Sequence, residues 1–403
     1  MELFWLEHKK LWRKKIVKIC VLLCFVYCVI FGSILSFQWF SFGSSDDYTS
    51  AFGNNFDGYT VIKDSQEYAL SFGGELTDET LQQIVSDYQQ MEADGMEEEL
   101  EKTDWQIVNS WLGTLYPELR DTSNYKTMIS YVDPDKLTGF YERRQQVLDE
   151  FLEVSGQVGA EKEFLHQIER KVEKPFRYEW VEGWSTLLGS MVADLGVVMA
   201  LFLGIVLSSL FAGEWHDNTS TLVLTTRNGW GKIALAKILT GLAFTVELFA
   251  LLAVSSVISQ LFFMGTAGWD MPIQNIKLIA VAPMNMLQAE IYEYAFVLLG
   301  AIGFAGIVMF ISAAVKNNVL TLLLSLAVVY GPMMIAEYLP YEMQKALDLI
   351  PLVGSSTDIF RTNTFRIFGK LIWSPYLLIT IPVLIGILCM PFAIKSWSRR
   401  MKA

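Results

Sequence analysis

The sequence predicts an α-helical polytopic membrane protein with six transmembrane helices and one inserted, mostly helical extracellular domain on an α+β base. Of the 403 residues, 52% are apolar, and the mean hydropathy is +0.34. The apolar residues gather in six long, nearly uncharged runs, and most acidic residues lie between the first two runs. About 20 apolar residues cross the hydrocarbon core as a helix, and continuous runs favour helices over a barrel, whose strands alternate.

The ends of the apolar runs set the expected order of elements. The first run is longer than the apolar core of a signal peptide, and no clear cleavage site follows it, so we expect it to be retained. The predicted order is an amphipathic helix at 1–15; spans at 16–37, 186–212, 232–263, 294–315, 319–338 and 370–395; an acidic domain at 38–185; a segment at 213–231; a loop at 264–293; short helices at 339–369; and a tail at 396–403.

The basic residues predict the orientation. Six Lys or Arg residues lie within 9–18, before the first span, and four lie within 395–402, after the last. Loops rich in Lys and Arg stay in the cytoplasm, and an even number of spans puts both ends on one side. We therefore expect both termini and residues 213–231 in the cytoplasm, and residues 38–185 outside a bacterial plasma membrane.

The acidic charge belongs to residues 38–185, which hold 30 Asp or Glu and 12 Lys or Arg residues. Such a domain repels nucleic acid and anionic lipid headgroups. Its charge either attracts cationic peptides or is a solvated surface. Apolar spacing predicts helices at 77–101, capped by Thr77, and at 135–174, interrupted near 155–159, while residues 59–62 predict a short strand.

No motif of an enzyme occurs in the chain. The sequence has no GxxxxGK[ST] phosphate loop, no HExxH, no CxxC and no GxSxG, and its three His residues are far apart. We therefore expect neither catalysis nor a cofactor or metal in this chain. Cys20, Cys24 and Cys28 form a stripe on the first span, either a metal site or, as buried Cys usually is, a small apolar packing face.

The segment between the second and third spans resembles that of the ABC-2 permeases, the membrane subunits of type 2 ABC exporters. An acidic residue at the end of the second span is followed in that family by a short Thr-rich helix, an Arg and a Lys. Glu214, Thr219, Leu222, Leu224, Arg227 and Lys237 fall on this pattern. Asn218 stands where Gly is common, and Thr226 stands where Pro is common. The resemblance covers about 1–37 and 180–403, not the acidic domain.

The resemblance implies the partners and their contact residues. The chain would pair with a second permease subunit, identical or related, and with two separate ATPase subunits that bind ATP and Mg. The substrate would be exported; a peptide, an antimicrobial or a cation are the options. A large domain between the first two spans occurs in bacterial branches linked to sodium export, peptide export and bacteriocin self-protection. The ATPase would contact Glu214, Trp215, Thr219, Leu222, Leu224 and Arg227, and the amphipathic elbow helix would use Phe4, Trp5, Leu11 and Trp12.

Two acidic residues lie inside predicted spans and away from their ends, Asp194 in the second and Glu247 in the third. A charge at the bilayer centre costs about 2.5–3.5 kcal/mol on insertion scales. These two residues either line a cation pathway or are protonated between packed helices. Two other functions stay open: a membrane-anchored receptor whose outer domain binds a ligand without transport, and a secondary transporter, which would require inverted repeats that the sequence lacks.

Overall fold

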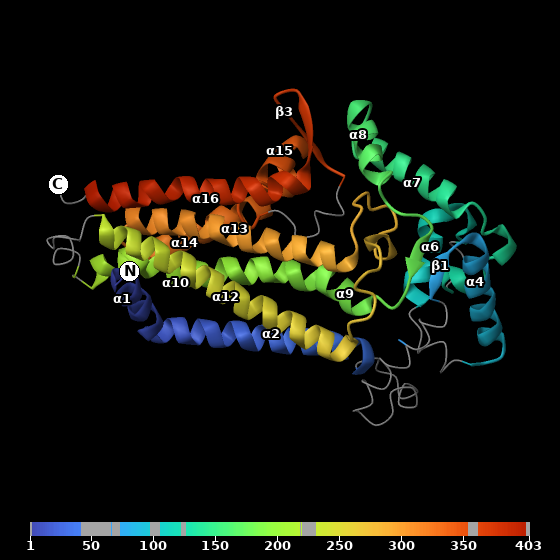
Figure 1. The fold of residues 1–403 in the computed structure, drawn as a ribbon, viewed down its shortest axis with the longest axis horizontal. Helices are drawn as coiled ribbons and strands as arrows, with labels where there is room; N and C mark the ends of the chain where they lie inside the picture. Colours follow the sequence, from blue (N-terminus) through green and yellow to red (C-terminus); the bar gives the residue numbers. More distant parts are fainter. Residues whose placement is uncertain are drawn as a thin grey trace.

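The computed structural model of the chain describes its long helices as one bundle with a cap of shorter helices at one end (Figure 1). Both termini lie at the opposite end, which is named the basal end below; the end that carries the cap is the distal end. The described residues are 2–41, 66, 73–96, 105–121, 126–217, 219, 231–353 and 362–399, and the side chains of 31–41, 105–106, 190–194 and 399 are not among them.

Within the described residues, five helices are long and apolar enough to cross a membrane, by length and composition. The prediction of a helical polytopic membrane protein is confirmed to this extent. The five segments are Leu195–His216, Lys232–Met264, Met286–Ala314, Asn318–Tyr338 and Ser374–Ser398.

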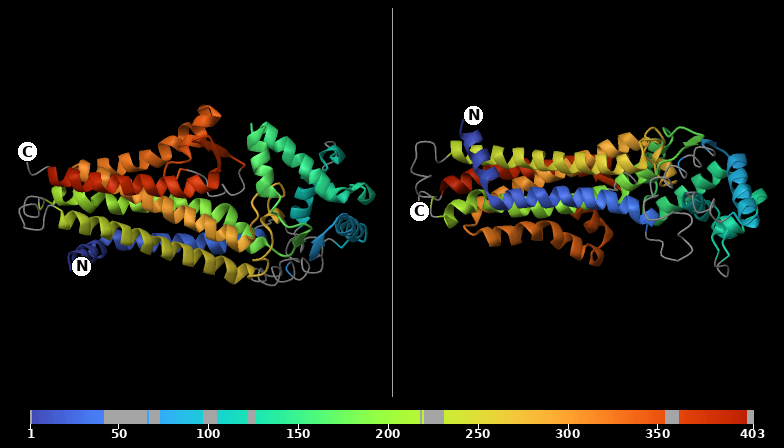
Figure 2. Two further views of the ribbon diagram at one scale, coloured as in Figure 1. Left: turned by 45° about the horizontal axis from the view of Figure 1, so that its top comes forward. Right: turned by 90° about the horizontal axis from the view of Figure 1, so that it is seen from below.

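The N-terminal region forms two helices, α1 (Glu2–Arg13) and α2 (Lys15–Ser41), with a bend at Lys14 between them. Helix α2 packs along the third long helix, α12 (Lys232–Met264) (Figures 1 and 2). Its packing face carries the cysteine stripe, at 2% exposed or less. The stripe was predicted to be either a metal site or an apolar packing face, and its burial against α12 favours the packing face. The stripe is Cys20, Cys24 and Cys28.

The helix that corresponds to the second expected span begins later than the predicted residue 186. Residues 182–186 form a short helix, α9 (Glu182–Thr186), and a π-helical turn at Leu187–Met191 leads into α10 (Val192–His216). The helix therefore starts at residue 192 rather than 186 and continues four residues past the expected end at 212. A π turn shifts the rotation of the helix, which lets 182–186 pack against the distal part of α12.

Helix α13 (Met286–Ala314) starts eight residues before the expected position of 294. A capping box explains the early start: the Asn285 side chain accepts from the Gln288 N–H, and the Gln288 side chain accepts from the Asn285 N–H. Helix α14 (Asn318–Ile335) is capped by Asn317 and ends in a 3₁₀ turn at Ala336–Tyr338. It lies at the margin of the bundle, against α10 and α13 (Figure 2).

The chain before the last helix, α16 (Ser374–Arg399), differs from the expectation of short helices over 339–369 and a span from 370. Only α15 (Tyr341–Leu347) is helical there among the described residues. Strands β3 (Thr364–Ile367) and β4 (Lys370–Trp373) form an antiparallel hairpin. Phe368 and Gly369 both have positive φ, the conformation that a tight two-residue hairpin turn requires, so residues 370–373 extend instead of starting the helix.

The distal cap consists of short helices over a two-stranded sheet. Thr77 caps the first helix as predicted, accepting a hydrogen bond from the Thr80 N–H. The second predicted stretch is helical on both sides of a break at 155–159. The expected strand at 59–62 lies outside the described residues. The elements are β1 (Gly74–Leu76), paired antiparallel with β2 (Phe176–Tyr178), and helices α4 (Asp78–Ala93), α6 (Trp105–Leu115), α7 (Phe140–Val154) and α8 (Ala160–Glu169), with 3₁₀ turns at Pro117–Leu119, Met128–Ser130, Pro134–Lys136 and, in the chain between α12 and α13, Ile273–Asn275.

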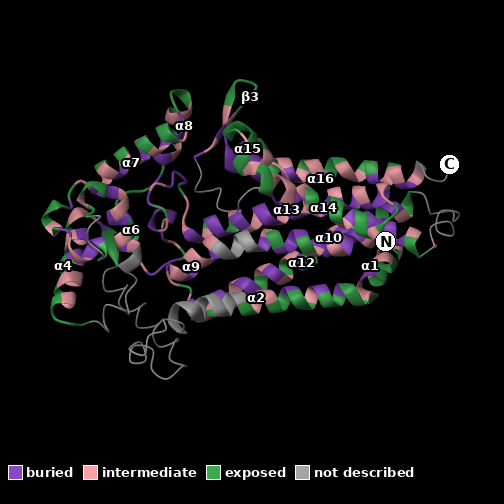
Figure 3. Cartoon of the chain, turned by 180° about the vertical axis from the view of Figure 1, so that it is seen from behind, coloured by how far each residue is buried: buried purple, intermediate pink, exposed green. Residues whose placement is uncertain are grey.

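Three large apolar cores support this arrangement in the described residues. One lies in the bundle along α10, α12 and α13, and a second lies in the cap between α4, α6 and the start of α7. The third lies between them, where α7 and α8 meet α9, the chain between α12 and α13, and the start of α13. Figure 3 shows the buried residues along the inside of the bundle, whereas α2 and α16 expose one side each. Exposed apolar side chains on long apolar helices are expected where lipid is the solvent.

Candidate functional site

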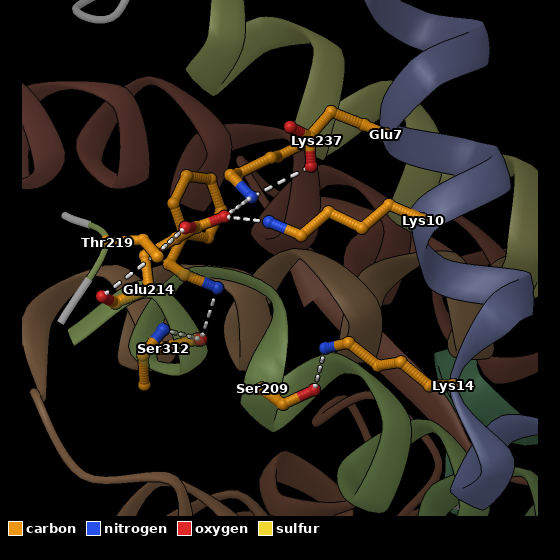
Figure 4. A network of polar contacts seen from close by, with 10 residues as sticks. Glu7, Lys10, Lys14, Ser209, Glu214, Thr219, Lys237 and Ser312 are labelled. Atoms are coloured by element: carbon orange, nitrogen blue, oxygen red, sulfur yellow. Dashed lines mark hydrogen bonds and ion pairs between the residues drawn. The ribbon is translucent and has the colours of Figure 1, made fainter. Parts of the chain in front are cut away.

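Three helices meet at a buried carboxylate at the basal end. Glu214 lies in the last turn of α10, and its side chain is 4% exposed. Its Oε1 atom accepts hydrogen bonds from Lys10 of α1, at 2.6 Å, and from Lys237 of α12, at 2.8 Å (Figure 4). One carboxylate oxygen thus joins α1, α10 and α12.

Lys237 explains why the carboxylate is needed. This residue lies six positions inside the apolar helix α12 and is 2% exposed. A buried ammonium group is very costly unless it is paired and hydrogen-bonded. Lys237 Nζ donates both to Glu214 and, at 2.9 Å, to Glu7 Oε2 of α1. The paired charges therefore hold α1 against the side of α12.

Thr219 closes the end of α10 on the same carboxylate. Its hydroxyl donates to Glu214 Oε2 at 2.5 Å, and its N–H donates to the Glu214 carbonyl oxygen at 3.0 Å. The second bond satisfies one of the carbonyl groups that a helix end leaves free. Both oxygens of the Glu214 carboxylate therefore have partners, and the chain that follows α10 begins in contact with the ion-pair cluster.

The pKa values of two lysines, one in α1 and one in the bend that follows it, shift in opposite directions near this cluster. Burial alone would lower the pKa of Lys10, but its hydrogen bond with Glu214 and the charge of that carboxylate outweigh burial and raise the pKa. Burial lowers the pKa of Lys14, and the nearby charges of Lys237 and Lys10 lower it further. Lys14 Nζ donates to Ser209 Oγ at 2.9 Å. A cavity of about 20 Å³ lies between these groups and has room for one water.

Trp215 joins the same helix end to the other side of the bundle. The Lys316 ammonium, in the turn between α13 and α14, lies 4.4 Å from the centre of the Trp215 ring. The ring also packs edge-on against Trp397 of α16, with centroids 6.3 Å apart. Ser312 of α13 adds a polar contact, accepting from the Phe211 and Ala212 N–H groups, each at 3.1 Å. The last two turns of α10 therefore contact α1, α12, α13 and α16 at the basal end.

The predicted elbow residues divide into two groups. Leu11 is buried at 2%, and the Trp12 ring packs on Phe244 of α12 with centroids 5.8 Å apart. Phe4 stacks on the His8 ring, whereas Trp5 is 61% exposed. Helix α1 therefore presents one apolar face to α12 and a second one outward.

Glu247, considered above as a pathway residue, lies in α12 against this elbow. Trp12 Nε1 donates to Glu247 Oε2 at 3.0 Å, and His8 Nε2 lies 3.2 Å from Oε1. The Glu247 side chain is 42% exposed. The structure thus gives Glu247 two partners on α1 instead of placing it between packed long helices. Asp194 belongs to α10, but its side chain lies outside the described residues.

The structure brings together three of the six predicted contact residues, namely Glu214, Trp215 and Thr219. The other three, Leu222, Leu224 and Arg227, lie outside the described residues. The sequence reasoning placed Lys237 on the family pattern but not among the contact residues, and it did not assign Glu7 or Lys10 to the site. A signal for Lys237 existed in the sequence. A cation inside an apolar helix requires a buried anion, and Glu214 is the first acidic residue after the second predicted span, shortly before the helix that contains Lys237.

The site connects several helices through polar and aromatic contacts, and the cluster around Glu214 is called the joint below. It contains ion pairs and ring contacts that connect α1, α10, α12 and the α13–α14 turn, and in the described part of the chain no group of three His, Cys, Asp or Glu residues has the arrangement of a metal site. Comparisons with protein-family models, with curated proteins and with solved structures found no match.

Proposed function

We propose that the chain is the membrane-spanning subunit of an ATP-driven exporter of the ABC-2 type. The observation that carries the proposal is the joint at Glu214. The residue that matches the acidic position of the family pattern is buried between Lys10 of the elbow and Lys237 of α12. Thr219, the next residue of the proposed ATPase contact after Trp215, is bonded to the same carboxylate.

The joint supplies a physical route for coupling. A force on residues 219–231 acts on the last turn of α10 through Thr219 and on the first turns of α12 through the chain itself. Because Glu214 ties α1 to both helices, the three move together. Paired, hydrogen-bonded charges in a low-dielectric interior resist separation, since each ion is left uncompensated when the pair breaks. ATP binding and hydrolysis by separate subunits would thereby shift helices that line a path.

The same proposal assigns the membrane topology. Helix α2 has 27 residues and an apolar sequence, and it supplies a sixth span beside the five described above. The basal end then faces the cytoplasm, with both termini, and the acidic cap lies outside. Six spans form half of a translocation path, so a second permease subunit and two ATPase subunits complete the transporter. The cap would guide or release the substrate.

The test is capture of the ATPase. A Leu222→Asp, Leu224→Asp double variant places two carboxylates where the proposed contact needs apolar side chains, and burying them is strongly unfavourable. We expect normal membrane insertion, loss of the co-purifying ATPase and loss of export. The control is Ser86→Asp with Gln90→Asp, which adds the same charge to exposed positions of α4 and leaves ATPase binding unchanged.

Two results contradict the proposal. One is a Leu222→Asp, Leu224→Asp protein that still binds its ATPase and exports. The other is a wild-type protein that purifies from its native membrane without any ATPase, as a membrane-anchored receptor would.

A further inference from the structure

A carboxyl group is buried near the distal end of the bundle, far along the chain from the basal joint. Glu290 lies in the second turn of α13, and its side chain is 3% exposed. Both carboxyl oxygens are shielded from solvent, and neither accepts a hydrogen bond of normal geometry. Within the described residues, no cationic group acts on Glu290. It therefore lacks the compensation that Glu214 has at the basal end.

A chain of hydroxyl groups leads from Glu290 to the neighbouring helix. Tyr294 follows one turn later on α13, and its hydroxyl is the titratable group that interacts with the Glu290 carboxyl. The same hydroxyl forms a hydrogen bond of 2.9 Å with Ser256 Oγ of α12. Ser256 is itself 2% exposed. A carboxyl group, a phenol and an alcohol thus form a line from α13 to α12.

Among the described residues, the other titratable groups identified around this end of α13 carry no positive charge. Glu293, on the same helix, is fully buried. Cys28 of α2 is close enough to interact electrostatically with the Tyr294 hydroxyl. Of the elements that pack against α13, α9 contributes Glu182, α16 contributes Tyr376, and α10 contributes Asp194, whose side chain lies outside the described residues. All of these are acids or neutral groups, so nothing among them offsets a negative charge on Glu290.

An isolated carboxylate in a protein interior is very costly, and such a group neutralises in practice. A proton fits the observed arrangement. The protonated carboxyl gains one donor, which can donate to the Tyr294 oxygen, while the Tyr294 hydroxyl donates to Ser256. We propose that Glu290 is a proton-binding site, and that Tyr294 and Ser256 connect it to α12. Separation of α12 from α13 at the distal end would break this chain, admit water and release the proton.

Infrared spectroscopy of the full-length protein in lipid nanodiscs tests the proposal directly. The carbonyl stretch of a protonated carboxylic acid is measured at neutral pH as the difference between wild type and variant. We expect the band in wild type and its loss in Glu290→Gln. Tyr294→Phe removes the acceptor and shifts the band. Glu118→Gln, at an exposed carboxylate 2.5 Å from Arg143, leaves it unchanged.

Two spectroscopic results overturn the proposal. If Glu290→Gln removes a carboxylate stretch and no acid band, Glu290 is ionised in the folded protein. If that carboxylate stretch also changes when Na⁺ or K⁺ is replaced by choline, the occupant is a monovalent cation. Folding gives an independent measurement. Gln matches the size and neutrality of a protonated Glu, so Glu290→Gln has the wild-type thermal midpoint at neutral pH. A variant that fails to fold, or one that is markedly more stable, contradicts the proposal.

The inference does not depend on the proposed exporter function. Loss of ATPase binding in the Leu222 and Leu224 variant concerns the basal end, whereas the infrared band reports on Glu290 in the permease alone. Either proposal can therefore fail without the other.

Discussion

At the scale of single residues, the ion pairs of this protein have very different surroundings. Lys237 and Glu214 are both almost fully buried, at 2% and 4% exposed, whereas Lys10, bonded to the same carboxylate oxygen, is 52% exposed. An exposed ammonium regains water when its partner is removed, and a buried carboxylate does not. The contribution of each lysine to stability is therefore set by burial more than by distance.

Substitution of the two lysines distinguishes these contributions. Lys237→Met keeps the aliphatic stem but leaves Glu214 with only one ammonium partner, and we expect a loss of about 3–5 kcal/mol. Lys10→Met should cost about 1 kcal/mol or less. Thermal unfolding in detergent, followed by Trp fluorescence, measures both.

The matched control is the double variant Lys237→Met, Glu214→Gln. Because it removes the almost fully buried Glu214 carboxylate and leaves only the more exposed Glu7 without Lys237, it should recover part of the stability that Lys237→Met loses. Equal effects of the two lysine variants, or additive effects in the double variant, would show that Lys237 acts by packing alone.

A second residue-scale prediction concerns Glu169 in the cap. Its side chain is 3% exposed, and it pairs with Arg144 at 2.5 Å and with Lys174 at 2.9 Å. Burial raises the pKa of Glu169, but the hydrogen bonds and charges of Lys174 and Arg144 outweigh burial and hold the pKa below its ordinary value. The pair therefore stabilises the fold fully above the unfolded pKa of about 4.3, and this contribution is lost as the pH falls through the lower, folded pKa.

The measurement is the thermal midpoint of wild type and Glu169→Gln between neutral and acidic pH. We expect wild type to be the more stable at neutral pH and the difference to shrink in acid. Glu163→Gln is the control, since Glu163 is 55% exposed and 3.3 Å from Arg170, and should have little effect at any pH. A difference for Glu169→Gln that stays constant with pH would exclude the ion pair as its cause.

At the scale of elements, the closest helix contact is the crossing of α13 and α16. Glycines on both helices let the two backbones touch: a Cβ atom at Gly306 would lie 2.3 Å from the Gly386 carbonyl oxygen, and one at Gly303 would lie 2.2 Å from that of Pro382. Small residues permit such approach in membrane helices, where packing rather than the hydrophobic effect drives association. The crossing thus requires glycine on both helices.

A single methyl group tests this crossing. Gly306→Ala must push two backbones apart, because the atoms that it meets belong to the main chain and cannot rotate away, and we expect a loss of roughly 1–3 kcal/mol or more. Gly331→Ala, in α14, meets no atom within 4 Å and should be neutral or stabilising by up to about 1 kcal/mol, since Ala is the better helix former. Thermal midpoints compare the two; equal midpoints would mean that the crossing is looser than described.

At the scale of the whole molecule, the cap and the bundle share an apolar core, and polar contacts join them on two sides. The buried Arg144 side chain of α7 donates to the carbonyl oxygens of Leu278, at 2.7 Å, and Ala280, at 3.2 Å, in the chain between α12 and α13. On the other side, Thr364 of the β3–β4 hairpin donates to Gln157 Oε1 at 2.7 Å. The cap is therefore connected to α12, α13 and α16, and movement of these helices reaches it directly.

The orientation of the whole molecule has a simple chemical test. In a background with Cys389 replaced by Ser, Ser86→Cys in the cap should react with an impermeant thiol reagent on intact cells. Asp217→Cys at the basal end should react only after the cells are permeabilised. Both positions are exposed. The remaining native cysteines are 2% exposed or less, so they give little background. Labelling of Asp217→Cys alone on intact cells would reverse the orientation.

The sequence by itself determined the features that depend on local composition and spacing. Apolar runs long enough to cross the hydrocarbon core as helices predicted the long helices, and five such helices are confirmed in the described residues. Thr77 predicted the start of α4, and the glycines at 156 and 159 predicted the break between α7 and α8. Each of these signals acts within a few residues of its effect, so no knowledge of distant contacts is needed to read it.

Only the tertiary structure decided which distant residues meet. Glu214 was identified by its place in a pattern, but its partner Lys10 lies 204 positions away, and no local rule connects them. Glu247 and Glu290 show the same limit: composition marks both as ionisable residues in or near apolar helices. The packing of α1 gives Glu247 two partners, and the packing of α13 leaves Glu290 without a cation among the described residues. Burial and pairing are properties of the assembled helices, because they depend on which faces come together.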